Sequence, residues 1–512
     1  MEFVIPMALG ICALALILLA TATRKPPYVA SSDDVVLGTT TPPLSVPMTE
    51  VRLGEAEQKY HAYILGRSGS GKSRALESIF LQHLNRGRGV GILEPHHDLS
   101  FDTLSFLVEK GFFRADDSFE KLLYIDWGNG HFVPFNILAS SQPPHVVALN
   151  TLDAMLRSWP ELADAPAFQT LFLAAVTTLI AAKLPITFLH QLITDKPFRD
   201  SCLAQVTDPL VHQKFQAFDR LGRDQAQESG SLLRRAFLLS FSPQARFTLG
   251  QPENWLDFRR IMDEGRSLII NLGNIDDGET KKLIGSMLMV QIEQAALSRS
   301  DLLPSQRTPF TLLVDEWSSF AAQEQTIAHI LSQCRKFNLR LYLAGQSVAQ
   351  IDSRRLAGAL ENCRLQIAFG LGRDSAVMHS HRIAPIDTRL VKEEAATPNQ
   401  HTQYFSVPEQ FESWAQELQS LEPRSAYVKL EGKPPVRIKT VGVSDPKPNP
   451  AELERVVSTY RRLYQRSREE AEQAVASVAH AATVVDSPPT FSENEPAYTR
   501  VFNQGHGPNG TN

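Results

Sequence analysis

Apolar residues follow two different spacings along the chain. Short apolar runs are typical of buried strands, and several segments between them have apolar residues every three or four positions, as helices do. The strand-like runs lie at residues 59–66, 90–94, 121–127, 266–273, 310–316, 340–345 and 364–370. Helical spacing is clear at residues 72–85 and 279–298. Apolar strands that alternate with helices predict an α/β fold, with a mostly parallel sheet covered by helices on both faces.

A long stretch of purely helical spacing interrupts this alternation. Residues 145–250 contain no strand-like run, which predicts an all-α insertion. Residues 426–443 resemble a closing hairpin, and residues 450–479 have the pattern of a charged helix with one apolar stripe. We expect a linker at 26–50, the first part of the α/β domain at 51–144, the all-α insertion at 145–260, the second part at 261–445, a C-terminal helix at 446–482 and a disordered tail at 483–512.

The N-terminal segment is apolar. Residues 3–22 carry no charge and have about the length that a helix needs to cross a bilayer, and Arg24 and Lys25 follow directly. A secretory signal peptide, which the small residues near the end of the run leave open, would have positive charge before the run instead. The flanking charges predict a single membrane helix within residues 1–25, with the rest of the chain in the cytoplasm.

Composition narrows the class of protein. With 43% apolar and 21% charged residues among 512, the chain is typical of folded globular proteins. The formal net charge of −5 excludes a surface covered in positive charge and leaves a local basic channel for nucleic acid open. The four cysteines lie far apart and match no zinc-binding spacing, so neither a disulfide framework nor a zinc site follows from them.

The sequence GRSGSGKS after the first strand fits the phosphate-binding pattern GxxxxGK[ST] in full. Glycines let such a loop curl so that backbone N–H groups point at the phosphates, and the following helix adds its positive N-terminal end. Lys72 is expected to reach the β- and γ-phosphates of ATP, and the Ser73 hydroxyl to bind Mg²⁺. The predicted nucleotide-binding residues are Gly66, Arg67, Ser68, Gly69, Ser70, Gly71, Lys72 and Ser73.

An acidic pair ends the apolar run FTLLVDE. Asp315 is expected to hold Mg²⁺ through water, and Glu316 to activate the attacking water as the general base. The alternative is a strand that ends at surface carboxylates. A second carboxylate favours a hydrolase over a small-molecule kinase, in which a substrate hydroxyl is activated instead.

The segment EPHHDL after the second strand contains Glu94, His96 and His97. These are metal-ligand residue types, but adjacent histidines on a loop seldom face one ion. Because the segment ends the strand beside the phosphate loop, we expect it to line the nucleotide site. The roles of the three side chains stay open.

The order of these motifs resembles a known family. YILGRSGSGKS, GILEPHHDL, VPFNIL, the helical insertion, RSLIINLG, FTLLVDE, CRKFNLRLYLAGQS and NCRLQIAFG, within residues 55–445, resemble the type IV secretion coupling ATPases, the TraG/TraD-like branch of the FtsK–HerA motor superfamily. The resemblance implies a RecA-like P-loop motor domain carrying the all-α insertion. It also implies a hexameric ring around a DNA channel, at the inner membrane of a bacterium.

The resemblance extends to two further site residues. Gln346, in LAGQS, matches a polar sensor of the γ-phosphate, and Arg335, in CRKFNL, matches an arginine offered to the nucleotide of the neighbouring subunit. The alternatives are that Gln346 caps a helix and that Arg335 pairs with an acid. The chain departs from the family in its single apolar N-terminal segment, where many members have two, and in EPHHD, where DPHGD is more usual.

Three functions fit these features. The first is a membrane-anchored ATPase that delivers DNA, with or without a bound relaxase, to the components of a conjugative channel. The second is a nucleotide-switched docking receptor for secreted proteins, and the third is a HerA-like motor for DNA processing or packaging. The pairs Arg234–Arg235 and Arg354–Arg355 are either DNA contacts or a solvated surface.

Overall fold

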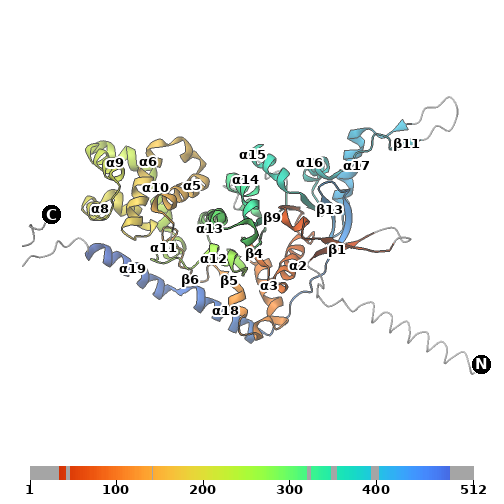
Figure 1. Cartoon of the computed structure of the whole chain (residues 1–512), viewed down its shortest axis with the longest axis horizontal. Coiled ribbons are helices and arrows are strands. Elements are labelled where there is room, and N and C mark those ends of the chain that lie inside the picture. Colours follow the sequence, from red (N-terminus) through yellow and green to blue (C-terminus); the bar gives the residue numbers. More distant parts are fainter. Residues whose placement is uncertain are drawn as a thin grey trace, which may run out of the picture.

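The computed structural model describes residues 34–41, 47–140, 142–319, 324–347, 354–393 and 403–484. Among these residues, eleven strands form one sheet in the order β2-β1-β14-β13-β10-β3-β9-β8-β4-β7-β5 (Figure 1). The parallel strands are β3 (Ala62–Leu65), β4 (Gly89–Glu94), β5 (Leu122–Asp126), β7 (Ser267–Asn271), β8 (Phe310–Val314), β9 (Leu339–Gly345) and β10 (Leu365–Ala368). The antiparallel strands are β1 (Val35–Thr40), β2 (Glu50–Leu53), β13 (Ser425–Leu430) and β14 (Val436–Thr440). The predicted mostly parallel α/β sheet is therefore confirmed.

Helices cover both faces of the sheet because its central strands are apolar on both sides. In β3, Ile64 packs into one core cluster while Tyr63 and Leu65 pack into the other, as expected when successive side chains point to opposite faces. The first face carries α2 (Lys72–Asn85), α3 (Asp98–Glu109) and α18 (Pro450–Tyr464). The second carries α13 (Gly278–Ser298), α14 (Glu324–Gln333), α16 (Arg373–Ile383) and α17 (Val407–Ser420).

A helical segment lies to one side of the sheet, at the left of Figure 1. It comprises α5 (Pro144–Ser158), α6 (Pro166–Ala181), α7 (Leu189–Thr194), α8 (Lys196–Leu203), α9 (Pro209–Arg220), α10 (Gln225–Phe241) and α11 (Pro243–Leu249). Its apolar residues continue the larger core cluster of the sheet. The structure thus has helices where helical spacing predicted them, while the division into domains at the stated boundaries remains a prediction.

Two segments differ from the sequence-based expectation. Residues 26–50 were expected to be a linker, but β1 and β2 join the main sheet, with Val35 fully buried. Pairing with β14, a contact remote in sequence, makes this short run a strand. The expected single helix at residues 446–482 is two helices, α18 and α19 (Arg468–Val484), separated by the short strand β15 (Arg466–Ser467), which pairs with β6 (His131–Phe132).

The prediction of an inner-membrane protein is corrected. None of the helices in the described residues has the length and apolarity needed to cross a bilayer. The prediction rested on the length and apolarity of residues 3–22, on the charges of Arg24 and Lys25 and on the family resemblance. Residues 1–33 lie outside the described residues, as does the expected tail from residue 485 onward.

Candidate nucleotide-binding site

The phosphate loop is the turn between β3 and α2. Gly69 and Gly71 have φ angles of 74° and 98°, in the left-handed region that glycine adopts without a steric penalty. A Cβ atom at Gly66 would lie 2.4 Å from the Ser70 hydroxyl and 2.8 Å from a Phe369 side-chain atom. These three glycines of the motif therefore have local structural reasons to be glycine.

The loop is fixed to the carboxyl ends of the strands on either side of β3. The N–H of Gly66 donates to the carbonyl of Gly345, at the end of β9, at 3.1 Å. The N–H of Arg67 donates to the carbonyl of Gly370, just after β10, at 2.9 Å. The first N–H groups of α2 have no acceptor within the helix and form a positive N-terminus suited to phosphate.

The acidic pair lies directly beside the start of α2. The hydroxyl of Ser73 donates to Oδ2 of Asp315 at 3.1 Å, and the Lys72 ammonium lies 3.5 Å from Oδ1 of the same carboxylate. Lys72 also forms an ion pair with Glu316, and Nε2 of Gln346 donates to Oε1 of Glu316 at 3.1 Å. The structure thus brings together five predicted site residues from three carboxyl-end segments of the sheet.

The two carboxylates occupy unusual environments. Burial raises the pKa of Asp315 above its usual value, and the Lys72 ammonium opposes that change. Glu316 has a φ angle of 44°, which is costly for a residue with a side chain and occurs mainly where the surroundings over-determine the backbone. Both carboxylates are mostly buried, with 5% exposure for Asp315 and 7% for Glu316.

The residues present fit ATP and Mg²⁺. Hydroxyl and carboxylate oxygens are the protein ligands that Mg²⁺ takes, and those of Ser73 and Asp315 are already in contact. Lys72, now paired with carboxylates, is at the position from which it can turn to phosphate oxygens. Among the described residues no group of three or more His, Cys, Asp or Glu side chains could hold a different metal.

Arg335 does not join this cluster within one chain. It lies in a 3₁₀ turn, Cys334–Phe337, before the amino end of β9, whereas the phosphate loop meets the carboxyl end of that strand. Its exposed guanidinium lies 5.4 Å from the centre of the Tyr60 ring, and Arg364 lies 4.4 Å from the same ring. Arg335 is therefore directed away from the nucleotide site of its own chain.

Glu94 caps a helix. Its two carboxylate oxygens accept from the N–H groups of Leu99 and Ser100, at 2.9 and 2.6 Å, in the first turn of α3. Of the two histidines, His96 is exposed, while Nδ1 of His97 lies 2.6 Å from the side-chain nitrogen of Asn271. The segment EPHHDL thus orders the start of α3. It ends β4, which pairs with β8 and β7 and is separated from β3 by β8 and β9, so the expectation that it follows the strand beside the phosphate loop is wrong.

The buried cap makes stability depend on pH. Burial raises the pKa of Glu94 from 4.5 to about 7, so the folded state binds the proton more tightly than the unfolded state. The free energy of unfolding therefore loses a contribution of up to about 3 kcal/mol as pH rises through that window. We expect Glu94→Gln to flatten this dependence in urea unfolding of the nucleotide-free protein between pH 4.5 and 7. An unchanged slope, relative to the exposed Glu279→Gln control, would contradict the assignment.

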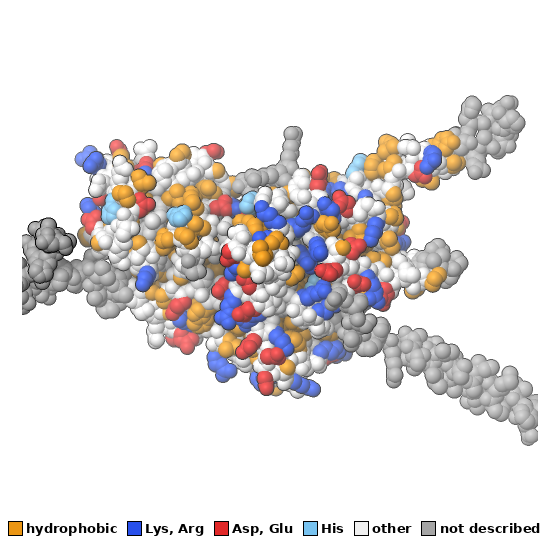
Figure 2. Space-filling model, viewed as in Figure 1, with side chains coloured by type: hydrophobic (Ala, Val, Ile, Leu, Met, Phe, Trp, Pro, Cys, Tyr) orange, Lys and Arg blue, Asp and Glu red, His pale blue; other side chains and the backbone are white. Residues whose placement is uncertain are grey.

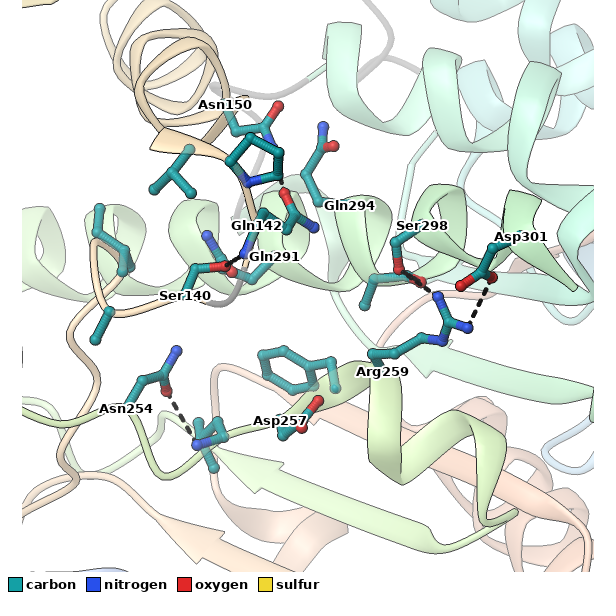
Figure 3. A pocket seen from close by; sticks show the side chains of 17 residues that line it. Ser140, Gln142, Asn150, Asn254, Asp257, Arg259, Gln291, Gln294, Ser298 and Asp301 are labelled. Atoms are coloured by element: carbon teal, nitrogen blue, oxygen red, sulfur yellow. Dashed lines mark hydrogen bonds and ion pairs between the residues drawn. The ribbon is translucent and has the colours of Figure 1, made fainter. Parts of the chain in front are cut away.

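A cavity elsewhere lacks the groups that phosphate needs. It measures about 590 Å³ and lies between α13, α5 and α12 (Phe258–Asp263) (Figure 3). The uncharged polar side chains in its lining are carboxamides and hydroxyls: Ser140, Gln142, Asn150, Asn254, Gln291, Gln294 and Ser298. Its described lining has one cation, Arg259, which already pairs with Asp301 at 2.9 Å. The phosphate loop is therefore the better nucleotide site despite the size of this cavity.

Two features at the carboxyl edge of the sheet were not predicted from the sequence. Oδ1 of Asp126 accepts from the side chains of Asn271 and Asn274, at 2.8 and 2.7 Å, beside His97. Asp126 and Asn271 end predicted parallel strands, and that position is the signal that could have found them. The second is Arg424, whose N–H donates to the carbonyl of Ser70 at 2.7 Å. No sequence pattern marks Arg424.

The fold and this cluster define an α/β P-loop protein with a helical segment beside its sheet. Solved structures with a similar fold include the bacterial conjugative coupling protein TrwB in its unbound monoclinic form, with a TM-score of 0.54 and 16% identity over 78% of this chain and 89% of that chain. The plasmid coupling protein TrwB in complex with ADP and Mg²⁺ has a TM-score of 0.55 and 16% identity over 82% of this chain and 98% of that chain. The predicted resemblance to coupling proteins is confirmed at the level of the fold.

A second kind of protein shares the fold. VirB4 of Thermoanaerobacter pseudethanolicus has a TM-score of 0.50 and 13% identity, over 83% of this chain and 99% of that chain. No protein-family model matches the sequence, and no curated protein sequence matches it. The shared fold is therefore recognised from the structure, because the sequence identities are too low for sequence comparison to detect it.

Proposed function

We propose that this protein is an ATPase that couples ATP hydrolysis to the delivery of DNA, or of a DNA–relaxase complex, into a conjugative type IV secretion channel. The observation that carries the proposal is the contact of Lys72, Ser73, Asp315, Glu316 and Gln346 at the carboxyl edge of the sheet. The phosphate loop, the two carboxylates and the Gln346 amide supply groups that bind phosphate, bind Mg²⁺ and activate water, as hydrolysis of a γ-phosphate requires. The fold shared with coupling proteins supports the choice of cargo.

Each residue has a distinct proposed role. Backbone N–H groups of residues 66–73 and the Lys72 ammonium bind the phosphates, while Ser73 and Asp315 hold Mg²⁺, Asp315 through water. Glu316 accepts the proton of the attacking water, and Gln346 senses the γ-phosphate. The bound Mg²⁺ would neutralise charge that develops on the transferring phosphoryl group.

The proposed assembly is a homo-oligomeric ring, with six subunits as the expected number. Arg335 is exposed and remote from the site of its own chain, as an arginine acting on a neighbouring subunit must be. Secretion-channel components and DNA are the other proposed partners. DNA would meet local basic groups, because Lys and Arg are mixed with Asp and Glu over the face shown in Figure 2.

One of the two arginine pairs is partly engaged within the chain. Arg235 forms an ion pair with Glu161, at 2.5 Å, which leaves the exposed Arg234 as the available member of its pair. The side chains of Arg354 and Arg355 lie outside the described residues.

The test is the effect of DNA on ATP turnover. We expect turnover to rise when duplex or single-stranded DNA is added at low salt, and the rise to disappear between about 50 and 200 mM salt, because phosphate contacts release counterions. Lys72→Ala is the control and should show no turnover with or without DNA. ATP turnover that does not change when DNA is added at low salt would contradict DNA as the cargo. The assignment as an ATPase would not be affected.

A further inference from the structure

Arg424 holds the phosphate loop from the opposite side to the acidic strand. It lies between α17 and β13 and has a φ angle of 67°, which arginine adopts at a cost. Its N–H donates to the carbonyl of Ser70 at 2.7 Å, and its carbonyl accepts from the N–H of Thr440 at 2.9 Å. The strained backbone thus links the phosphate loop to the hairpin formed by β13 and β14.

Its side chain passes between two glycines from different segments. A Cβ atom on Gly71, in the phosphate loop, would lie 3.0 Å from Cγ of Arg424. A Cβ atom on Gly442, after β14, would lie 2.3 Å from a terminal guanidinium nitrogen, Nη2, of the same side chain. Both glycines leave space for this one arginine.

The guanidinium has no counter-ion within the described part of the chain. Arg424 is half-buried, its Nε is buried without a hydrogen-bond partner, and it forms no ion pair with a carboxylate of the described residues. The nearby Arg74 differs, because it pairs with Glu77, Asp102 and Asp445. Arg67 likewise has no ion-pair partner among the described residues, but its side chain is exposed.

A partly buried cation without a partner loses hydration without compensation, so such an arginine favours a bound anion. In the phosphate loop that the Arg424 backbone contacts, the Ser70 hydroxyl is likewise buried without a hydrogen-bond partner. The anion expected at this loop is the phosphate chain of a nucleotide. Arginine suits that role because its planar donors bind phosphate oxygens in pairs.

We propose that the guanidinium of Arg424 is an additional phosphate-binding group of the nucleotide site, supplied by the same chain, and that its backbone positions the loop. The inference rests on the proposed nucleotide binding. It assigns a role to a residue outside the phosphate-loop and acidic-strand motifs. It also explains why residue 442 is glycine although its φ angle lies outside the left-handed region.

The first variant distinguishes the contribution of the Arg424 side chain from that of its backbone. Arg424→Asn keeps the N–H to Ser70 and tolerates the left-handed backbone, but it removes the charge. We expect its affinities for Mg-ATP, Mg-ADP and sodium tripolyphosphate, measured by competition against a fluorescent ATP analogue, to fall about 10- to 100-fold. Arg424→Lys should recover part of this loss.

The second variant displaces the guanidinium from a distance. Gly442→Ala places a methyl group where Nη2 lies, and a flexible side-chain end can move to relieve that contact. We expect it to weaken binding in the same direction with little change in thermal unfolding. Gly278→Ala is the matched control, because a Cβ atom there meets nothing within 4 Å.

The outcomes are separable. If wild-type protein binds and hydrolyses ATP while Arg424→Asn and Gly442→Ala bind phosphates as tightly as wild type, the inference is wrong and the proposed function stands. If Arg424→Asn is unfolded, Gly442→Ala decides the question. If wild-type protein itself does not bind ATP, the proposed function fails and the inference fails with it.

Discussion

Replacing Glu316 by glutamine is expected to stop ATP turnover while ATP binding persists. Glutamine keeps the shape of the side chain but cannot accept a proton from water, and a positioned general base contributes about 10²- to 10⁴-fold. The same change removes the carboxylate that holds Lys72 by an ion pair, and Lys72 is then free to turn to the phosphates. Affinity for ATP should therefore be unchanged or higher.

The measurement is the rate of phosphate release, beside ATP affinity by equilibrium binding. Asp315→Asn serves as the companion variant and should instead weaken Mg²⁺ binding, so that turnover requires a higher Mg²⁺ concentration. If the Glu316→Gln protein retains wild-type turnover, the assignment of Glu316 as the general base is wrong. DNA transfer that continues in cells carrying only this variant would favour the alternative of a nucleotide-switched receptor.

Replacing Arg335 by alanine is expected to lower turnover by about 10³-fold or more, the scale of an arginine supplied to a phosphoryl transition state. The reason is positional: Arg335 lies at the amino end of β9, and the phosphate loop contacts the carboxyl end. Only a neighbouring subunit could present this side chain to the site. Arg364→Ala is the matched control, since Arg364 stacks on the same Tyr60 ring.

Mixing two inactive variants provides the stricter measurement. In a mixed assembly, a site with intact Glu316 from an Arg335→Ala subunit can face Arg335 from a Glu316→Gln subunit. Part of the turnover should then return, in proportion to such interfaces. Mixed protein that stays inactive although both variants co-assemble would contradict action between subunits.

Local patterns predicted the elements well where burial on both faces left a continuous apolar run. The strands at residues 59–66, 90–94 and 310–316 appear as β3, β4 and β8, and the helix at residues 72–85 is α2. Strands β1 and β2 were not predicted. They belong to the sheet only because β1 pairs with β14, which is distant in sequence. The single C-terminal helix was wrong because β15 pairs with β6, another contact remote in sequence.

The candidate residues of the site and their expected roles could be predicted from the sequence by itself. GRSGSGKS and the Asp315–Glu316 pair each need only a strand end and a following turn, which are local properties. The tertiary structure decided which of these groups meet, because sheet order sets the distances between strand ends. In the tertiary structure Gln346 contacts Glu316, and Arg335 lies at the amino edge of the sheet, opposite the phosphate loop. Arg424 contacts the phosphate loop through a hydrogen bond that no local pattern predicts.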